Sequence, residues 1–412
     1  MIAPLRALLY LLALALVAAP GYAAPPKQPL VAPLMAPTVA PVKAPLIAPV
    51  KAPLIAPVKA PLIAPVKAPA AEPLPPRGQY QNRPEVQAFI AEMTQKHGFV
   101  EGELKLLFSR ARYYPDIITL ITPPTNPRVR SWQAYRSRFI EPVRIDGGVA
   151  LWKRHAEALA RAEKEYGVPA EIIVAIMGVE TVYGRNTGGY RVIDALTTLS
   201  FDYPRRADFF RDELENYLLF ARDEGIDIFA LRGSYAGAIG IPQFMPSSWR
   251  KWAVDFDGDG KIDLRGSFVD AIGSVANYLK AHGWVAGAPI AFPAQVEGNA
   301  WRDLLVRDIE PSAKLVDLPK LGVASAPLLR QGLPDDTLCA LIDLVTPDAP
   351  TEYWVGLQNF YVITRYNRSS FYAMSVMELA RAVKQSRRDQ AAIKPARRAL
   401  AASAQSRGVA AR

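Results

Sequence analysis

The sequence predicts a mainly helical domain of the α+β class between residues 79 and 382. Apolar residues recur at helical spacing over most of this region, whereas runs suited to strands are short. Nearly all the aromatic residues of the chain also lie within it, as expected of the part that forms a core. The expected helices are 84–97, 101–112, 149–166, 169–184, 206–223, 246–253, 268–282 and 372–385.

Strand-like pieces occur late in this domain. Residues 289–292 and 354–364 combine apolar, β-branched and aromatic side chains. Residues 285–350 show no sustained helical period. We therefore expect a small irregular or β insertion at about 285–350, inside a domain that is otherwise helical.

The helix expected at 169–184 carries the most informative residue of the chain, Glu180. Pro169 suits the first turn of a helix and Gly184 suits its exit. Ile176 and Met177 lie four and three residues before Glu180, on the same face. Apolar surroundings favour the neutral form of a carboxyl group, and a protonated acid can donate to a leaving oxygen. The alternative is a helix-end Glu whose carboxylate simply reaches water.

A short acidic segment, 255–263, predicts a calcium loop. Its acids stand at positions 1, 3, 5 and 9, with Gly260 at the sharp turn of an EF-hand pattern. Gly266 stands at position 12, where a bidentate Glu belongs, so we expect Asp270 to complete the site from a longer loop. An acidic turn without a metal is the alternative. The expected ligands of a structural Ca²⁺ are Asp255, Asp257, Asp259, Asp270 and the backbone oxygen of Lys261.

Two further segments carry neutral hydrogen-bonding groups. Residues 233–248 combine closely spaced glycines and alanines, which let a bulky ligand approach the backbone, with Ser234 and Gln243. Residues 359–372 group aromatic rings with amides. Such side chains suit a groove that stacks on sugar rings and hydrogen-bonds their substituents. Tight packing through small residues and an ordinary aromatic core are the alternatives.

The first 24 residues are typical of a secretory signal peptide. Arg6 precedes an apolar stretch, and small residues near position 23 suit cleavage. The apolar stretch is about 13 residues, short of the roughly 20 that span a bilayer. We expect an exported, periplasmic protein; an uncleaved membrane anchor is the alternative. No cysteine stands directly after the apolar stretch, where a lipid would be attached, so a lipoprotein is not expected. The only cysteine of the chain is Cys339.

Residues 25–78 form an Ala/Pro/Lys repeat. Proline at this density disfavours helix and sheet and leaves polyproline II as the local preference. About 50 residues at about 3.1 Å each could reach on the order of 150 Å. The segment is therefore expected to act as a spacer; a disordered linker with drifted repeats is the alternative.

The positive charge lies at the two ends of the chain. Of the net charge of +10, residues 381–412 contribute +8 and residues 1–76 contribute +5, which leaves −3 for residues 77–380. We expect residues 383–412 to form a basic, disordered tail. Such a tail could attract an anionic wall or membrane surface, and the signal peptide argues against nucleic acid as a partner. A merely solvated end is the alternative.

Several separate segments resemble, in order, the lytic murein transglycosylases of the membrane-bound B type (glycoside hydrolase family 103). The resemblance covers about residues 83–382. The segments that carry it are 167–174, 178–181, 199–206, 240–248, the acidic loop, 270–278, 282–284 and 363–367. It implies a lysozyme-like fold, peptidoglycan glycan strands as the substrate and one catalytic acid, at Glu180. The best-known members are lipoproteins. This chain departs from them because it has no cysteine after the signal peptide to carry the lipid.

The resemblance also implies a set of substrate-binding residues. The saccharide groove of the family corresponds here to Tyr135, Ser234, Gln243, Tyr278, Tyr366, Asn367 and Tyr372. Contacts to the peptide stems correspond to Arg205 and Arg206. We expect the enzyme to act as a monomer.

The sequence shows no second acid that clearly belongs in this groove, although a glycosidase ordinarily uses two carboxylates. The resemblance implies that the N-acetyl group of N-acetylmuramic acid takes the place of the second one, so that cleavage forms a 1,6-anhydro end. Two alternatives stay open. One is a hydrolysing muramidase of the same fold, and the other is a peptidoglycan-binding protein without activity.

Overall fold

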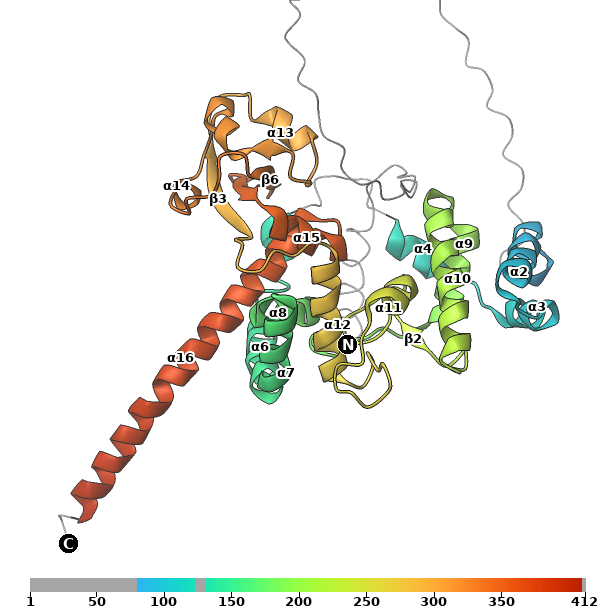
Figure 1. Ribbon diagram of the computed structural model, residues 1–412, viewed down its shortest axis with the longest axis horizontal. Coiled ribbons are helices and arrows are strands. Elements are labelled where there is room, and N and C mark those ends of the chain that lie inside the picture. Colours follow the sequence, from blue (N-terminus) through green and yellow to red (C-terminus); the bar gives the residue numbers. More distant parts are fainter. Residues whose placement is uncertain (1–79, 123–130, 410–412) are drawn as a thin grey trace, which may run out of the picture. The chain divides into compact units, whose positions relative to one another are not determined.

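The computed structural model describes residues 80–122 and 131–409, with side chains described up to residue 392 (Figure 1). The mainly helical α+β prediction is confirmed. The helices are α2 (Pro84–His97), α3 (Glu101–Arg110), α4 (Pro115–Ile121), α5 (Trp132–Arg136), α6 (Pro142–Arg154), α7 (Ala156–Tyr166), α8 (Ala170–Thr181), α9 (Val192–Asp202), α10 (Ala207–Asp223), α11 (Pro246–Trp252), α12 (Phe268–Ala281), α13 (Arg302–Val306), α14 (Ala326–Leu329), α15 (Gln358–Tyr366) and α16 (Ser370–Val409).

Helix α8 lies at the centre of the main core. It packs against α6, α7, α12 and α16. Every residue from Ile172 to Thr181 is buried, so this helix is apolar on all sides rather than amphipathic. Because the helix is buried from Ile172 onward, the polar residues of its last turn also lie in the protein interior. Glu180 is one of them.

The β insertion is a five-stranded antiparallel sheet with strand order β4-β6-β7-β3-β5. It has its own cluster of buried apolar side chains, including Trp301, Leu341 and Val355. A separate two-stranded sheet pairs β1 (Tyr190–Arg191) with β2 (Arg232–Gly233) in the helical part of the domain. The strands of the sheet are β3 (Ala291–Val296), β4 (Ala313–Lys314), β5 (Val323–Ala324), β6 (Leu338–Leu344) and β7 (Glu352–Gly356).

Three expectations from the sequence differ from the structure. The helix expected at 149–166 is two helices that meet at His155. The strand expected at 354–364 ends at Gly356 and is followed by α15. The Asn359 side chain explains this second difference, because it bonds the backbone of Val285 and Ala288 and ties this segment to the loop after α12.

The third difference concerns the C-terminal tail. Residues 383–412 were expected to form a disordered tail, but α16 continues through Val409. Alanine, arginine, lysine and glutamine dominate this stretch, and all four are good helix formers. The signal peptide and the repeat lie outside the described residues. Within the described part of the chain, none of the helices combines the length and apolar character that a membrane span requires.

Candidate active site

Glu180 is the penultimate residue of α8, and only 7% of it is exposed. The Tyr372 hydroxyl, from the first turn of α16, donates to its Oε1 at 2.6 Å. Burial raises the pKa of Glu180 to about 7, and the Tyr372 hydrogen bond opposes part of that rise because it stabilises the carboxylate. A group with this pKa can both give and take a proton near neutral pH.

Five tyrosines from different parts of the chain lie within electrostatic range of the Glu180 carboxyl. For each of them burial is the largest cause of a raised pKa, and the negative charge of Glu180 raises it further. They are Tyr135 of α5, Tyr235 after β2, Tyr278 of α12, Tyr366 of α15 and Tyr372. The structure thus brings four of the predicted groove tyrosines together around Glu180.

Tyr235 is the member of this group that sequence reasoning missed. Its side chain is completely buried, and its hydroxyl has no hydrogen-bond partner among the described residues. In the sequence it stands beside Ser234 inside the small-residue motif, where a tyrosine is easily taken for a core side chain. Adjacency to a predicted binding residue was the signal available for it.

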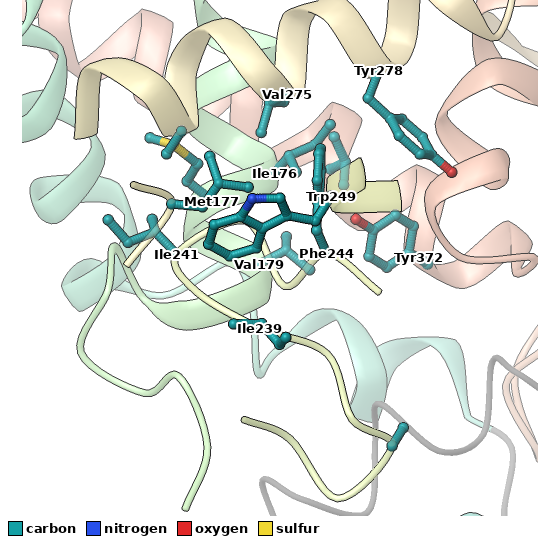
Figure 2. Close-up of a cluster of buried hydrophobic side chains, with 14 of the residues drawn as sticks. Ile176, Met177, Val179, Ile239, Ile241, Phe244, Trp249, Val275, Tyr278 and Tyr372 are labelled. Carbon is teal, nitrogen blue, oxygen red and sulfur yellow. The ribbon is translucent and has the colours of Figure 1, made fainter. Parts of the chain in front are cut away.

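Backbone carbonyls hold two of the phenols in place. The Tyr366 hydroxyl donates to the carbonyl of Pro242 at 2.6 Å, and the Tyr278 hydroxyl donates to that of Arg365 at 2.7 Å. The Tyr366 and Tyr372 rings lie nearly parallel, at 13° with centroids 6.4 Å apart. Figure 2 shows Tyr278 and Tyr372 beside Phe244 at one end of the apolar cluster that surrounds α8. The aromatic side of the site is therefore tied to the backbone at two points.

The loop between β2 and α11 supplies the remaining predicted polar groups. Gln243 has a left-handed backbone, with φ of 51°, and its amide donates to the carbonyls of Gly240 and Thr187. The Ser234 hydroxyl accepts the backbone N–H of Ala238 and so holds the turn that carries Tyr235. Thr181 ties this loop to α8, because its hydroxyl donates to the carbonyl of Ile241 at 2.8 Å.

Asn367 carries a free hydrogen-bonding atom. It follows Tyr366 at the end of α15 and is 8% exposed. Its Oδ1 is buried and has no partner among the described residues. A buried amide oxygen without a partner costs free energy, which a ligand that donates to it would recover.

Arg205 and Arg206 lie in the 3₁₀ turn before α10. Arg205 is exposed, whereas Arg206 is half-buried and its guanidinium lies over the Phe209 ring at 4.1 Å. Sequence reasoning also missed Glu213 of α10, a buried acid that accepts the N–H and the hydroxyl of Ser247 and so holds the start of α11.

The acidic loop brings three predicted ligands together. Oxygen atoms of Asp255, Asp257 and Asp259 lie within 4.8 Å of one another. Asp270 is 1% exposed, and its carboxylate accepts backbone N–H groups of Phe256, Asp257 and Asp263. Asp270 therefore shapes the loop, and three clustered carboxylates form a donor set of hard oxygens that fits Ca²⁺.

Comparison with known proteins identifies the family. The model of the transglycosylase SLT domain matches residues 81–381. The chain belongs to the lytic transglycosylases. It is 45% identical over 317 residues to membrane-bound lytic murein transglycosylase B of Escherichia coli K12, a match that covers 74% of this chain and 84% of that protein.

Solved structures agree with this assignment. Soluble lytic transglycosylase SltB1 from Pseudomonas aeruginosa is 51% identical with a TM-score of 0.67, covering 74% of this chain and 99% of that one. Escherichia coli Slt35, solved in complex with calcium, is 44% identical with a TM-score of 0.65, covering 74% and 94%. This protein is therefore an enzyme of the lytic murein transglycosylase type with a lysozyme-like fold, as its sequence motifs predicted.

Proposed function

We propose that Glu180 is the single acid and base of this lytic transglycosylase, acting on the bond between N-acetylmuramic acid and N-acetylglucosamine. The observation that carries the proposal is the burial of this carboxyl at the end of an apolar helix, which raises its pKa to about 7. At that pKa a substantial fraction of the enzyme holds the proton that the leaving oxygen needs.

The reaction follows from one carboxyl group and the substrate itself. Glu180 gives its proton to the glycosidic oxygen as the bond to the muramic anomeric carbon breaks. The N-acetyl carbonyl oxygen of the same sugar bonds to that carbon and does the work of a second carboxylate. Glu180, now a carboxylate, takes the proton of the C6 hydroxyl, whose oxygen displaces the N-acetyl oxygen. The 1,6-anhydro ring closes without water, and Glu180 is protonated again.

We also propose that the tyrosines and amides around Glu180 hold the glycan. The free Oδ1 of Asn367 suits an N–H or hydroxyl donor of a sugar, and the partly exposed ring of Tyr366 offers stacking surface. A further solved relative supports peptidoglycan as the ligand. SltB3 from Pseudomonas aeruginosa, 30% identical with a TM-score of 0.61, was solved in complex with NAG-NAM-pentapeptide. Arg205 is exposed and available to the acidic groups of the peptide stems.

The ion loop is proposed to hold one structural Ca²⁺ through Asp255, Asp257, Asp259, Asp270 and the backbone oxygen of Lys261. The clustered carboxylates and the Slt35 complex with calcium support this. When bound, the ion neutralises the acids and fixes the start of α12. No step of the reaction passes through it.

The test of the proposal is the substitution Glu180→Gln. An amide fills the same space and cannot deliver a proton, so we expect turnover to fall by at least about 10² while glycan binding and the melting temperature are retained. Glu171→Gln, at the other end of the same helix, is the matched control and should keep wild-type turnover. Retention of more than about a tenth of the wild-type rate by Glu180→Gln would show that another group is the acid.

A further inference from the structure

The turn directly after Glu180 has an unusual backbone. Val182 and Tyr183 are both left-handed, with φ of 51° and 59°. The N–H of Tyr183 bonds the carbonyl of Met177, and that of Val182 bonds the carbonyl of Gly178. This closure of a helix normally uses glycine, and a β-branched valine in the left-handed region is unfavourable. Something outside the turn must therefore hold it.

The Tyr183 side chain supplies that hold, because it fills a socket made by three glycines. A Cβ built on Gly147 of α6 would lie 2.8 Å from the Tyr183 ring, and one on Gly148 would lie 2.6 Å from its hydroxyl. A Cβ on Gly178 of α8 would lie 2.5 Å from the same hydroxyl and 2.8 Å from the ring carbon that bears it. No side chain larger than hydrogen fits at these three positions while the ring is in place.

Hydrogen bonds fasten the ring and the helix end to the same residue. The Tyr183 hydroxyl donates to the carbonyl of Arg144 at 2.6 Å. Arg144 is only 4% exposed. Its Nε donates to the carbonyl of Gly178 at 3.1 Å. Its guanidinium also bonds the carbonyl of Arg138 and the carboxylate of Glu141, each at 2.7 Å. A cation that bonds the last carbonyls of a helix stabilises that end.

From these contacts we infer that Tyr183 is a positioning residue for the reaction, seated in a socket of Gly147, Gly148 and Gly178 that fixes the last turn of α8. The inference rests on the proposed role of Glu180. If the Tyr183 ring leaves the socket, the last turn of α8 frays. The Glu180 carboxyl then moves relative to the bond it must protonate, and water reaches the carboxyl. Misplacement of a catalytic group by about 1 Å can cost as much as about 10² in rate.

The test compares Tyr183→Phe with the wild type through kcat, KM and the pH dependence of kcat/KM on soluble glycan fragments. We expect kcat to fall about tenfold with KM unchanged, since the buried hydroxyl bonds the carbonyl of Arg144 and is not offered to a ligand. The decline of kcat/KM at high pH should move to lower pH, because a better solvated acid loses its proton more readily. Unchanged kcat and an unchanged pH profile, with or without a lower melting temperature, would overturn the inference.

A double-mutant cycle tests the socket itself. Gly178→Ala should lower kcat although alanine favours a helix, whereas Gly102→Ala in α3, where a Cβ meets nothing within 4 Å, should be neutral. In a Tyr183→Leu background Gly178→Ala should add no further loss. Additive losses would overturn the inference. Failure of the proposed function is distinguishable, because it would appear as an active Glu180→Gln enzyme whatever the Tyr183 variants do.

Discussion

At the residue scale, the Glu180 carboxyl is controlled by two opposing effects. Burial at the end of α8 favours the protonated acid, and the Tyr372 hydrogen bond favours the carboxylate. The first effect is larger, so the pKa rises to about 7 instead of falling. Tyr372 thus keeps the pKa of Glu180 from rising further. With a higher pKa the acid would hold its proton too tightly, because the same group must afterwards act as a base.

This balance predicts the pH dependence. The free enzyme must hold the proton, so kcat/KM should decline as the pH rises through about 7. Tyr372→Phe removes the hydrogen bond that lowers the pKa, so the decline should move to higher pH and kcat should fall. Initial rates on soluble glycan fragments between pH 5 and about 9 would measure both. A shift of the decline to lower pH in Tyr372→Phe would contradict this account of the carboxyl.

At the element scale, local sequence signals predicted the helices and strands that neighbouring residues determine. They missed those that depend on contacts with distant residues. Pro169 marks the start of α8 correctly because a helix start is local, whereas the exit expected at Gly184 is wrong: the helix ends at Thr181, where contacts of the Tyr183 side chain with α6 hold the turn. Helix α9 (Val192–Asp202) was missed, since its β-branched residues disfavour a helix and only its burial in the core favours one. α15 was predicted as strand because the Asn359 contacts that hold it are 71 or more residues away.

The candidate site divides in the same way. Motif spacing was enough to point to Glu180. It was also enough to point to the acids at 255, 257 and 259, whose carboxylates cluster in the structure. The Tyr183 socket could not be predicted, because it depends on contacts between α6 and α8. Tyr235 offered only its place beside Ser234 as a signal, because its position near Glu180 depends on how a distant loop folds. Arg205 is exposed in the turn before α10, and its contact with the peptide stems stays a prediction.

The ion loop yields a prediction at this scale. An ion bound only by the folded state stabilises it by about 2.7 kcal/mol at a hundredfold excess over Kd. Calcium should therefore raise the melting temperature, and Asp255→Ala should abolish the rise while leaving turnover largely intact. Asp336→Ala, an exposed acid of the β insertion, is the control and should keep the rise. Equal melting temperatures in chelator and in millimolar calcium would show that the loop binds no calcium.

At the scale of the whole molecule, the family match spans residues 81–381 and leaves both ends of the chain outside it. The signal peptide and the repeat remain predictions, as does the monomeric state. So does attraction of the basic ends to an anionic surface. Helix α16 extends to Val409, so the basic residues up to Arg407 lie on a helix.

The repeat is expected to act through its reach. Deleting residues 25–76 should leave the activity of the purified enzyme on soluble fragments unchanged, because the catalytic domain begins after them. Activity in the cell should fall, since proline-rich sequence extends at about 3.1 Å per residue. Scrambling the repeat at constant composition, the control, should be tolerated. Complete function in cells that carry the deletion would favour a linker without a role in reach.

At the centre of the proposed chemistry, a single buried carboxyl and the substrate's own N-acetyl group cleave the glycan without water. Mass spectrometry of the products from purified peptidoglycan tests this most directly, with wild type and Glu180→Gln side by side. We expect 1,6-anhydromuropeptides, lighter by one water than hydrolysis products, from the wild type and essentially none from the variant. Reducing muropeptides as the main product, or undiminished anhydro products from Glu180→Gln, would contradict it.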